Sequence, residues 1–108
     1  MDFKIIDKSF GEYTNSIIIE GKIDGVKTIY DIRVKFDKMK IYVDSYGIKT
    51  GRQREFRYPK LDNMEYRKAS IEERGLLTRE FYKENIPSEV SNLALEEFSK
   101  SIIIDTFQ

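Results

Sequence analysis

Residues 16–36 read SIIIEGKIDGVKTIYDIRVKF, and this stretch sets the architecture of the chain. In its second half, apolar and aromatic side chains alternate with mainly charged ones, which is the period-two pattern of a strand with one solvated face. Between the two apolar runs stands Asp24-Gly25, a strong signal for a two-residue hairpin turn. The stretch therefore predicts two antiparallel strands, residues 16–23 and 26–36.

Three further segments predict strands on either side of this hairpin. Residues 3–7 alternate before it, and residues 39–43 continue the inward-facing pattern after a tight turn at Asp37-Lys38. Arg52–Tyr58 has the polar character of an edge strand, and Pro59 ends it. Residues 1–60 thus predict a meander of four or five antiparallel strands.

The period changes to that of helices after residue 60. Ser70 and Glu73 have the spacing of a capping box, which predicts a helix that runs to about Asn85. A second helix is expected from about residue 88, with three side chains facing inward: Val90, Ala94 and Phe98. Ile102–Ile104 can extend this helix or form a last strand, and we favour helix for its start. Residues 61–69 are an extra helical turn or a loop.

Strands followed by helices are typical of the α+β class. At 108 residues the chain predicts a single domain, with the meander in 1–60, a mainly helical part in 61–108, and two C-terminal helices packed on one face of the sheet. Residues 1–8 have no apolar core of a signal peptide, and no apolar run approaches the roughly 20 residues of a membrane span. The expectation is a soluble cytoplasmic protein.

The composition excludes several chemistries. The chain has no Cys and no His, so disulfides, thiolate nucleophiles and Ser–His–Asp mechanisms are impossible. Asp7 and the pair Glu20 and Lys22 have a spacing that a carboxylate-metal nuclease could use, but alternating Glu and Lys are common on any solvated strand face. Neither a phosphate-binding loop nor a dinucleotide fingerprint is present. The sequence therefore predicts no catalytic residue, no metal and no cofactor, and a carboxylate-metal nuclease stays open as an alternative.

Residues 49–60, which we call the basic segment, carry five cations and one carboxylate although the whole chain has 19 of each sign. Cations interleaved with aromatic rings are suited to nucleic acid, because guanidinium groups bind phosphates and rings stack on bases. The same residues also suit an edge strand that Lys and Arg protect from pairing. The candidate nucleic-acid residues are Lys49, Arg52, Arg54, Arg57, Tyr58 and Lys60.

The outward face of the sheet is the other candidate surface. Aromatic and apolar side chains inside a charged frame are typical of a small protein-docking patch. The residues expected in this patch are Ile29, Arg33, Tyr42 and Tyr46. The C-terminal helix is acidic, so its attraction to the basic segment of another copy is a route to self-association. The sequence therefore predicts a small non-enzymatic protein that binds a protein partner or forms a homodimer; the alternative is a nucleic-acid-binding accessory protein.

Overall fold

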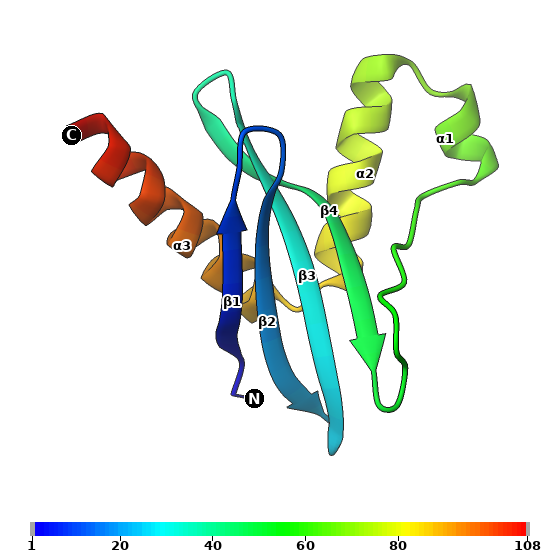
Figure 1. Cartoon of the computed structure of the whole chain (residues 1–108). Coiled ribbons are helices and arrows are strands. Elements are labelled where there is room, and N and C mark those ends of the chain that lie inside the picture. Colours follow the sequence, from blue (N-terminus) through cyan, green and yellow to red (C-terminus); the bar gives the residue numbers. More distant parts are fainter. Residues whose placement is uncertain (1, 108) are drawn as a thin grey trace.

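The computed structural model describes the backbone of residues 2–107 and the side chains of residues 2–102. Four antiparallel strands form one sheet in the order β1-β2-β3-β4, and helices follow them on one side of it (Figure 1). The elements are β1 (Lys4–Phe10), β2 (Asn15–Ile23), β3 (Val26–Asp37), β4 (Lys40–Thr50), α1 (Met64–Lys68), α2 (Ile71–Asn85) and α3 (Ser88–Phe107). The predicted α+β class and its antiparallel meander are confirmed.

The central hairpin forms where the sequence places it. Ile23 pairs with Val26, so the turn consists of Asp24 and Gly25. Both turn residues have positive φ, 51° and 79°, which is the conformation that a tight hairpin between twisted strands requires. A second tight turn at Lys38 and Met39 joins β3 to β4. Met39 was expected to face inward, but this turn leaves its side chain 86% exposed.

A β-bulge in β4 changes which residues face the helices. Ser45 lies opposite Arg33 and Val43 lies opposite Val34, so Asp44 is the extra residue. The odd-numbered residues of β4 face the helices before the bulge, and the even-numbered ones face them after it. Tyr46 consequently lies in the core with 4% of its surface exposed, and the expectation that it belongs to the outward face is wrong.

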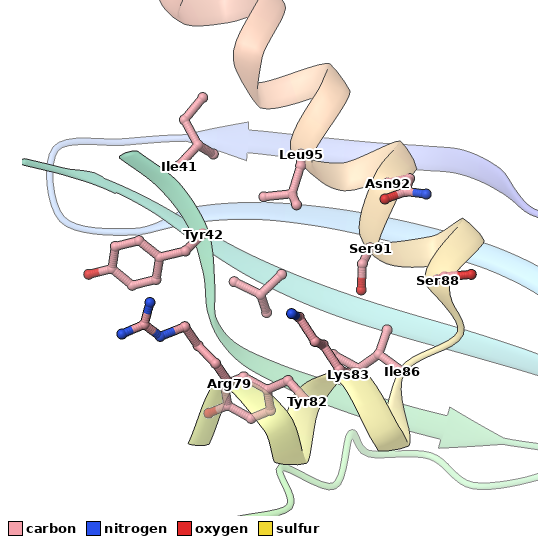
Figure 2. A pocket seen from close by; sticks show the side chains of 11 residues that line it. Ile41, Tyr42, Arg79, Tyr82, Lys83, Ile86, Ser88, Ser91, Asn92 and Leu95 are labelled. Atoms are coloured by element: carbon pink, nitrogen blue, oxygen red, sulfur yellow. The ribbon is translucent and has the colours of Figure 1, made fainter. Parts of the chain in front are cut away.

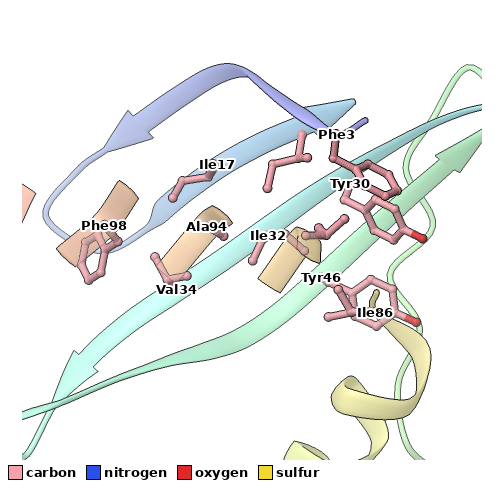
Figure 3. Close-up of a cluster of buried hydrophobic side chains, with 11 residues drawn as sticks. Phe3, Ile17, Tyr30, Ile32, Val34, Tyr46, Ile86, Ala94 and Phe98 are labelled. Atoms are coloured by element: carbon pink, nitrogen blue, oxygen red, sulfur yellow. The ribbon is translucent and has the colours of Figure 1, made fainter. Parts of the chain in front are cut away.

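The core lies between the sheet and α3, which crosses β1 to β4 on one face (Figures 1 and 3). Val90, Ala94 and Phe98 recur every four residues along α3, and all three are buried as predicted. They meet the inward side chains of β2 and β3, among them Ile17 and Ile32. Burial of each large aliphatic side chain stabilises the fold by roughly 1.5–3 kcal/mol, so the contacts between α3 and the sheet are the main source of the stability of the fold.

Helix α2 is much less buried. The Ser70 hydroxyl accepts a hydrogen bond from the Glu73 backbone N–H at 3.2 Å, which confirms the predicted cap. None of the 15 residues of α2 is buried, and among the strands it has its contacts with β4. One side-chain hydrogen bond joins it to the sheet, from the Tyr82 hydroxyl to the Asp44 carbonyl at 3.0 Å. Figure 1 shows α2 leaning away from the β3–β4 hairpin.

Three remaining segments differ in outcome. The prediction of a strand at Arg52–Tyr58 is wrong, because the β pairing there consists of one isolated bridge between Ile48 and Arg57. Residues 61–69 contain a helical turn, α1. The backbone of Ile102–Ile104 continues α3, so this run does not add a strand.

Candidate functional site

The space between α2 and α3 is an open groove of about 470 Å³ over the inner face of β4. Its floor and end consist of apolar side chains, and its walls carry polar and cationic groups (Figure 2). We call it the α2–α3 groove; its residues are Ile41, Tyr42, Val43, Arg79, Tyr82, Lys83, Ile86, Ser88, Ser91, Asn92 and Leu95.

The groove exists because the two helices are joined at a buried point and then diverge. Ile86 follows α2 directly and is 1% exposed, so the connection is anchored in the core. Its backbone N–H bonds to the Tyr82 carbonyl at 2.8 Å and closes the last turn of α2. Pro87 then starts α3 in a new direction, because a proline cannot continue the hydrogen bonding of α2. The inner side of β4 between the helices is therefore left partly uncovered, and Ile41 and Val43 are half-buried there.

The electrostatic character of the groove comes from its α2 wall. Arg79 and Lys83 lie one turn apart, are exposed, and extend over the groove in Figure 2. Within residues 2–102, neither has a carboxylate partner. Burial and then the nearby Asp44 raise the pKa of Tyr82, so its hydroxyl keeps the proton that it donates to the β4 carbonyl. The groove therefore combines an apolar floor with two cations at its rim that form no ion pair among the described side chains.

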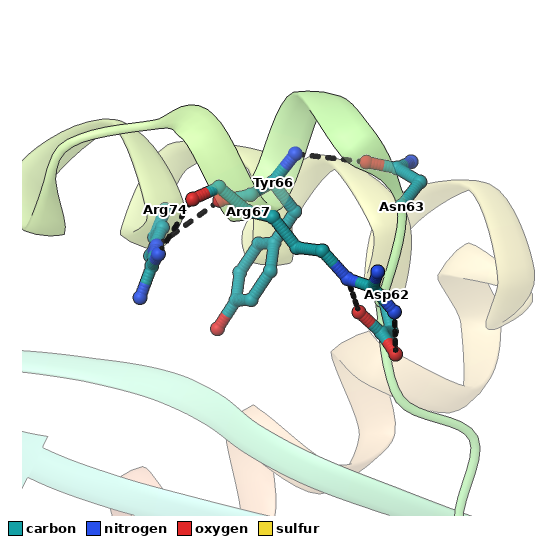
Figure 4. A network of polar contacts seen from close by, with 5 residues as sticks. All are labelled: Asp62, Asn63, Tyr66, Arg67 and Arg74. Atoms are coloured by element: carbon teal, nitrogen blue, oxygen red, sulfur yellow. Dashed lines mark hydrogen bonds and ion pairs between the residues drawn. The ribbon is translucent and has the colours of Figure 1, made fainter.

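The N-terminal end of α2 is held by α1 rather than by the sheet (Figure 4). Arg74 donates to the carbonyls of Tyr66 and Arg67 at 3.0 and 2.9 Å, and its guanidinium lies 5.2 Å from the Tyr66 ring centre. Arg67 forms a two-point ion pair with Asp62 at 2.8 and 3.0 Å. This network lies mostly in solvent, so it orients α1 against α2 without fixing either to the core.

The outward face of the sheet has a covered polar centre. Asp31 is one of the charged residues that alternate along residues 26–36, and it lies on the outward face, yet it is only 5% exposed. The Tyr58 hydroxyl donates to its carboxylate at 2.9 Å, the Ser16 hydroxyl donates to the other oxygen, and Arg33 lies 3.5 Å away. The Tyr58 ring occupies space that only glycine leaves free, because a Cβ on Gly47 would lie 2.6 Å from it. The basic segment is thus fixed across this face.

The predicted protein patch is not assembled as one surface. Ile29 and Arg33 lie on the outward face and are half-exposed, and Arg33 is engaged with Asp31 and Tyr58. Tyr42 lines the α2–α3 groove, whereas Tyr46 is in the core. Sequence reasoning missed Arg79, Lys83 and Leu95 as possible site residues. The four-residue spacing of Arg79 and Lys83 could be recognised in the sequence, but the groove beside them depends on the direction of α3.

The basic segment uses its aromatic rings within the molecule. The Lys49 ammonium lies 4.8 Å from the centre of the Phe56 ring, and the Arg33 guanidinium lies 4.8 Å from that of Tyr58. These cations occupy positions that a stacked base would take. The segment's own cations have no ion pair in the part of the chain whose side chains are described: Lys49, Arg52, Arg54, Arg57 and Lys60.

The residues weighed for nuclease chemistry are also placed by the structure. Glu20 binds Lys27 on the neighbouring strand at 2.9 Å, and that hydrogen bond lowers the pKa of its carboxyl group. Asp7 lies opposite Ile18 on β2. Among the described residues, no three carboxylates come together as a metal site would need. No helix in the described part is long and apolar enough to cross a membrane.

The chain was compared with models of protein families, with curated proteins and with solved structures, and none of them matched.

Proposed function

We propose that this chain is a non-enzymatic protein-binding domain, and that its α2–α3 groove takes a segment of a partner polypeptide. The observation that carries the proposal is that α2 buries none of its 15 residues while an apolar groove stays open beside it. A helix of this length is marginal on its own in water and gains stability from packing its apolar side. Phe81 and Tyr82 give α2 part of that packing against the core, and the partner would supply more.

The groove also indicates the chemistry of the partner. Val43 and Leu95 provide half-exposed apolar surface, which a partner's apolar side chains would cover. Arg79 and Lys83 stand at the rim without carboxylate partners among the described side chains. A segment that brings apolar residues and a nearby carboxylate therefore complements the groove in both shape and charge.

A peptide selection tests this proposal without a known partner. A displayed library of random peptides is selected on the wild-type protein, and the enriched peptides are measured against Leu95→Asp and Ile29→Asp. Both variants replace a half-exposed apolar residue by Asp, but Ile29 lies on the opposite face of the sheet. We expect peptides that bind the wild type and Ile29→Asp but not Leu95→Asp.

Peptides that bind the wild type and Leu95→Asp but not Ile29→Asp would place the binding site on the outward face and contradict the proposal for the groove. The absence of any enriched peptide sensitive to Leu95→Asp would overturn it as well. Circular dichroism spectra of both variants verify that each still has the wild-type fold.

Nucleic-acid binding is the second candidate, and it is favoured by the cations of the basic segment, which form no ion pair among the described side chains. Labelled single- and double-stranded oligonucleotides are titrated at two salt concentrations against the wild type and an Arg52/Arg54/Arg57→Ala variant. Binding that salt weakens steeply and the triple variant loses would support this candidate. Binding unchanged by the three substitutions would exclude the basic segment as the site.

A further inference from the structure

We infer that the partner of the α2–α3 groove is a second copy of this chain, which docks its own α2 antiparallel along the first. This inference rests on the proposed function of the groove and names its occupant. The evidence is an exposed stripe on α2, which we call the α2 stripe, formed by Glu72, Leu76, Arg79 and Lys83.

The spacing of the α2 stripe is that of a helix-pairing seam. Its members follow one another by four, three and four residues, so they lie along one line of the helix over about 16 Å. All four side chains are exposed, and Leu76 leaves 57% of its surface in water. Two members, Arg79 and Lys83, also line the groove, so a helix paired along the stripe comes to lie over the groove mouth.

The charges of the α2 stripe are complementary to those of a second α2 stripe that runs antiparallel to it. When a second α2 runs in the opposite direction, Glu72 of each copy meets Lys83 of the other. Leu76 then meets the aliphatic part of Arg79, which covers apolar surface while its guanidinium stays in water. A two-fold axis makes each of these contacts twice, as an interface between identical surfaces requires.

Two further properties of the chain favour a second copy. In the part of the chain with described side chains, Glu72, Arg79 and Lys83 form no ion pair, so no internal carboxylate or cation competes with the charge pairing. Arg79 Nε donates to the Gly75 carbonyl of its own helix at 3.3 Å. The chain carries 19 cationic and 19 anionic side chains, and two copies with no net charge do not repel each other overall.

Sedimentation equilibrium of the wild-type chain, from about 1 µM to about 1 mM, measures this association. The charge-reversal variants Glu72→Lys and Lys83→Glu should each weaken the dimer about tenfold, because each turns two attractive contacts into repulsive ones. The double variant restores opposite charges and should return the dissociation constant to near the wild-type value. Glu73→Lys is the matched control, since it makes the same charge change in the same turn but off the stripe.

Each outcome decides the inference. Loss of association in both single variants, with recovery in the double variant, supports it. A monomer at every concentration overturns the second copy as occupant, while the peptide selection separately decides whether the groove binds at all. A dimer whose dissociation constant is unchanged by both Glu72→Lys and Lys83→Glu also contradicts the inference, because its interface then lies elsewhere. Circular dichroism confirms that α2 is folded in each variant.

Discussion

The basic segment and α2 are both attached to β4, but in opposite ways. The basic segment has almost no regular structure, yet Tyr58 fixes it to the sheet by covering Gly47 and bonding to the buried Asp31. Helix α2 is regular and well capped, yet it buries no residue. The comparison shows that local regularity and attachment to the core are separate properties, set by different residues.

The largest effect should come from Tyr58→Ala, which removes the anchor of the basic segment. Loss of the ring uncovers Gly47 and takes a hydrogen bond from a buried carboxylate, so we expect the free energy of unfolding to fall by about 2–4 kcal/mol. Urea denaturation measures this change. Trypsin should also cut faster after Arg52, Arg54 and Arg57, because the freed segment becomes a better substrate.

Tyr58→Phe separates the two contributions of this side chain. It keeps the ring over Gly47 and removes the hydroxyl, so its cost should be about 1–2 kcal/mol. If Tyr58→Ala left both stability and trypsin cleavage unchanged, the basic segment would not be anchored as described.

The same contact predicts a dependence of stability on alkaline pH. Burial, and then the hydrogen bond to Asp31, raise the pKa of Tyr58 above its ordinary value of 10.0. The folded state therefore holds this proton more tightly than the unfolded state. The resulting stabilisation is complete below pH 10 and is lost as the pH rises through the raised folded-state pKa.

The measurement is the difference in unfolding free energy between the wild type and Tyr58→Phe across the alkaline range. That difference should shrink as the pH rises, because only the wild type loses the contribution of the Tyr58 proton. Tyr30, Tyr46 and Tyr82, whose pKa values are also raised, are present in both proteins, so their effects cancel. A constant difference would mean that the Tyr58 proton is not linked to folding.

Much of the fold was predictable because its signals are local. The turn at Asp24 and Gly25, the cap at Ser70 and the four-residue recurrence of Val90, Ala94 and Phe98 each depend on neighbours in the sequence. Each of these signals has its physical cause within a few residues or a few helical turns. The structure confirms all three.

The features that could not be predicted depend on contacts between distant residues. Nothing near Asp44 marks it as the extra residue of a bulge, so the alternation of β4 was extended wrongly to Tyr46. Asp31 looked like a solvated carboxylate because Tyr58, which covers it, lies 27 residues further along the chain. The groove was not predicted, because it depends on the angle between two correctly predicted helices.

A smaller effect is expected where α2 meets the sheet. Tyr82→Phe removes the hydrogen bond to the Asp44 carbonyl and should cost about 1 kcal/mol. Amide hydrogen exchange should accelerate in α2 and remain unchanged around Tyr58, because the two attachments to β4 are separate. Tyr13→Phe is the control, since its side chain is 86% exposed. Equal acceleration in both regions would show that α2 and the basic segment unfold together.

The smallest effects come from one substitution made in each region, and they should have opposite signs. In α2, Gly75→Ala adds a Cβ whose nearest neighbour is the Arg79 guanidinium at 3.7 Å, an ordinary contact. Alanine also favours the helix, so we expect a gain of about 0.5–1 kcal/mol, seen chiefly as slower amide exchange within α2.

In β4, Gly47→Ala places the same methyl group 2.6 Å from the Tyr58 ring, which must then shift away from Asp31. We expect a loss of about 1 kcal/mol or more, with faster trypsin cleavage of the basic segment. Urea denaturation and amide exchange of the two variants measure both signs. A gain at both positions would mean that Tyr58 moves freely, and the contrast between a fixed irregular segment and a loosely held helix would then fail.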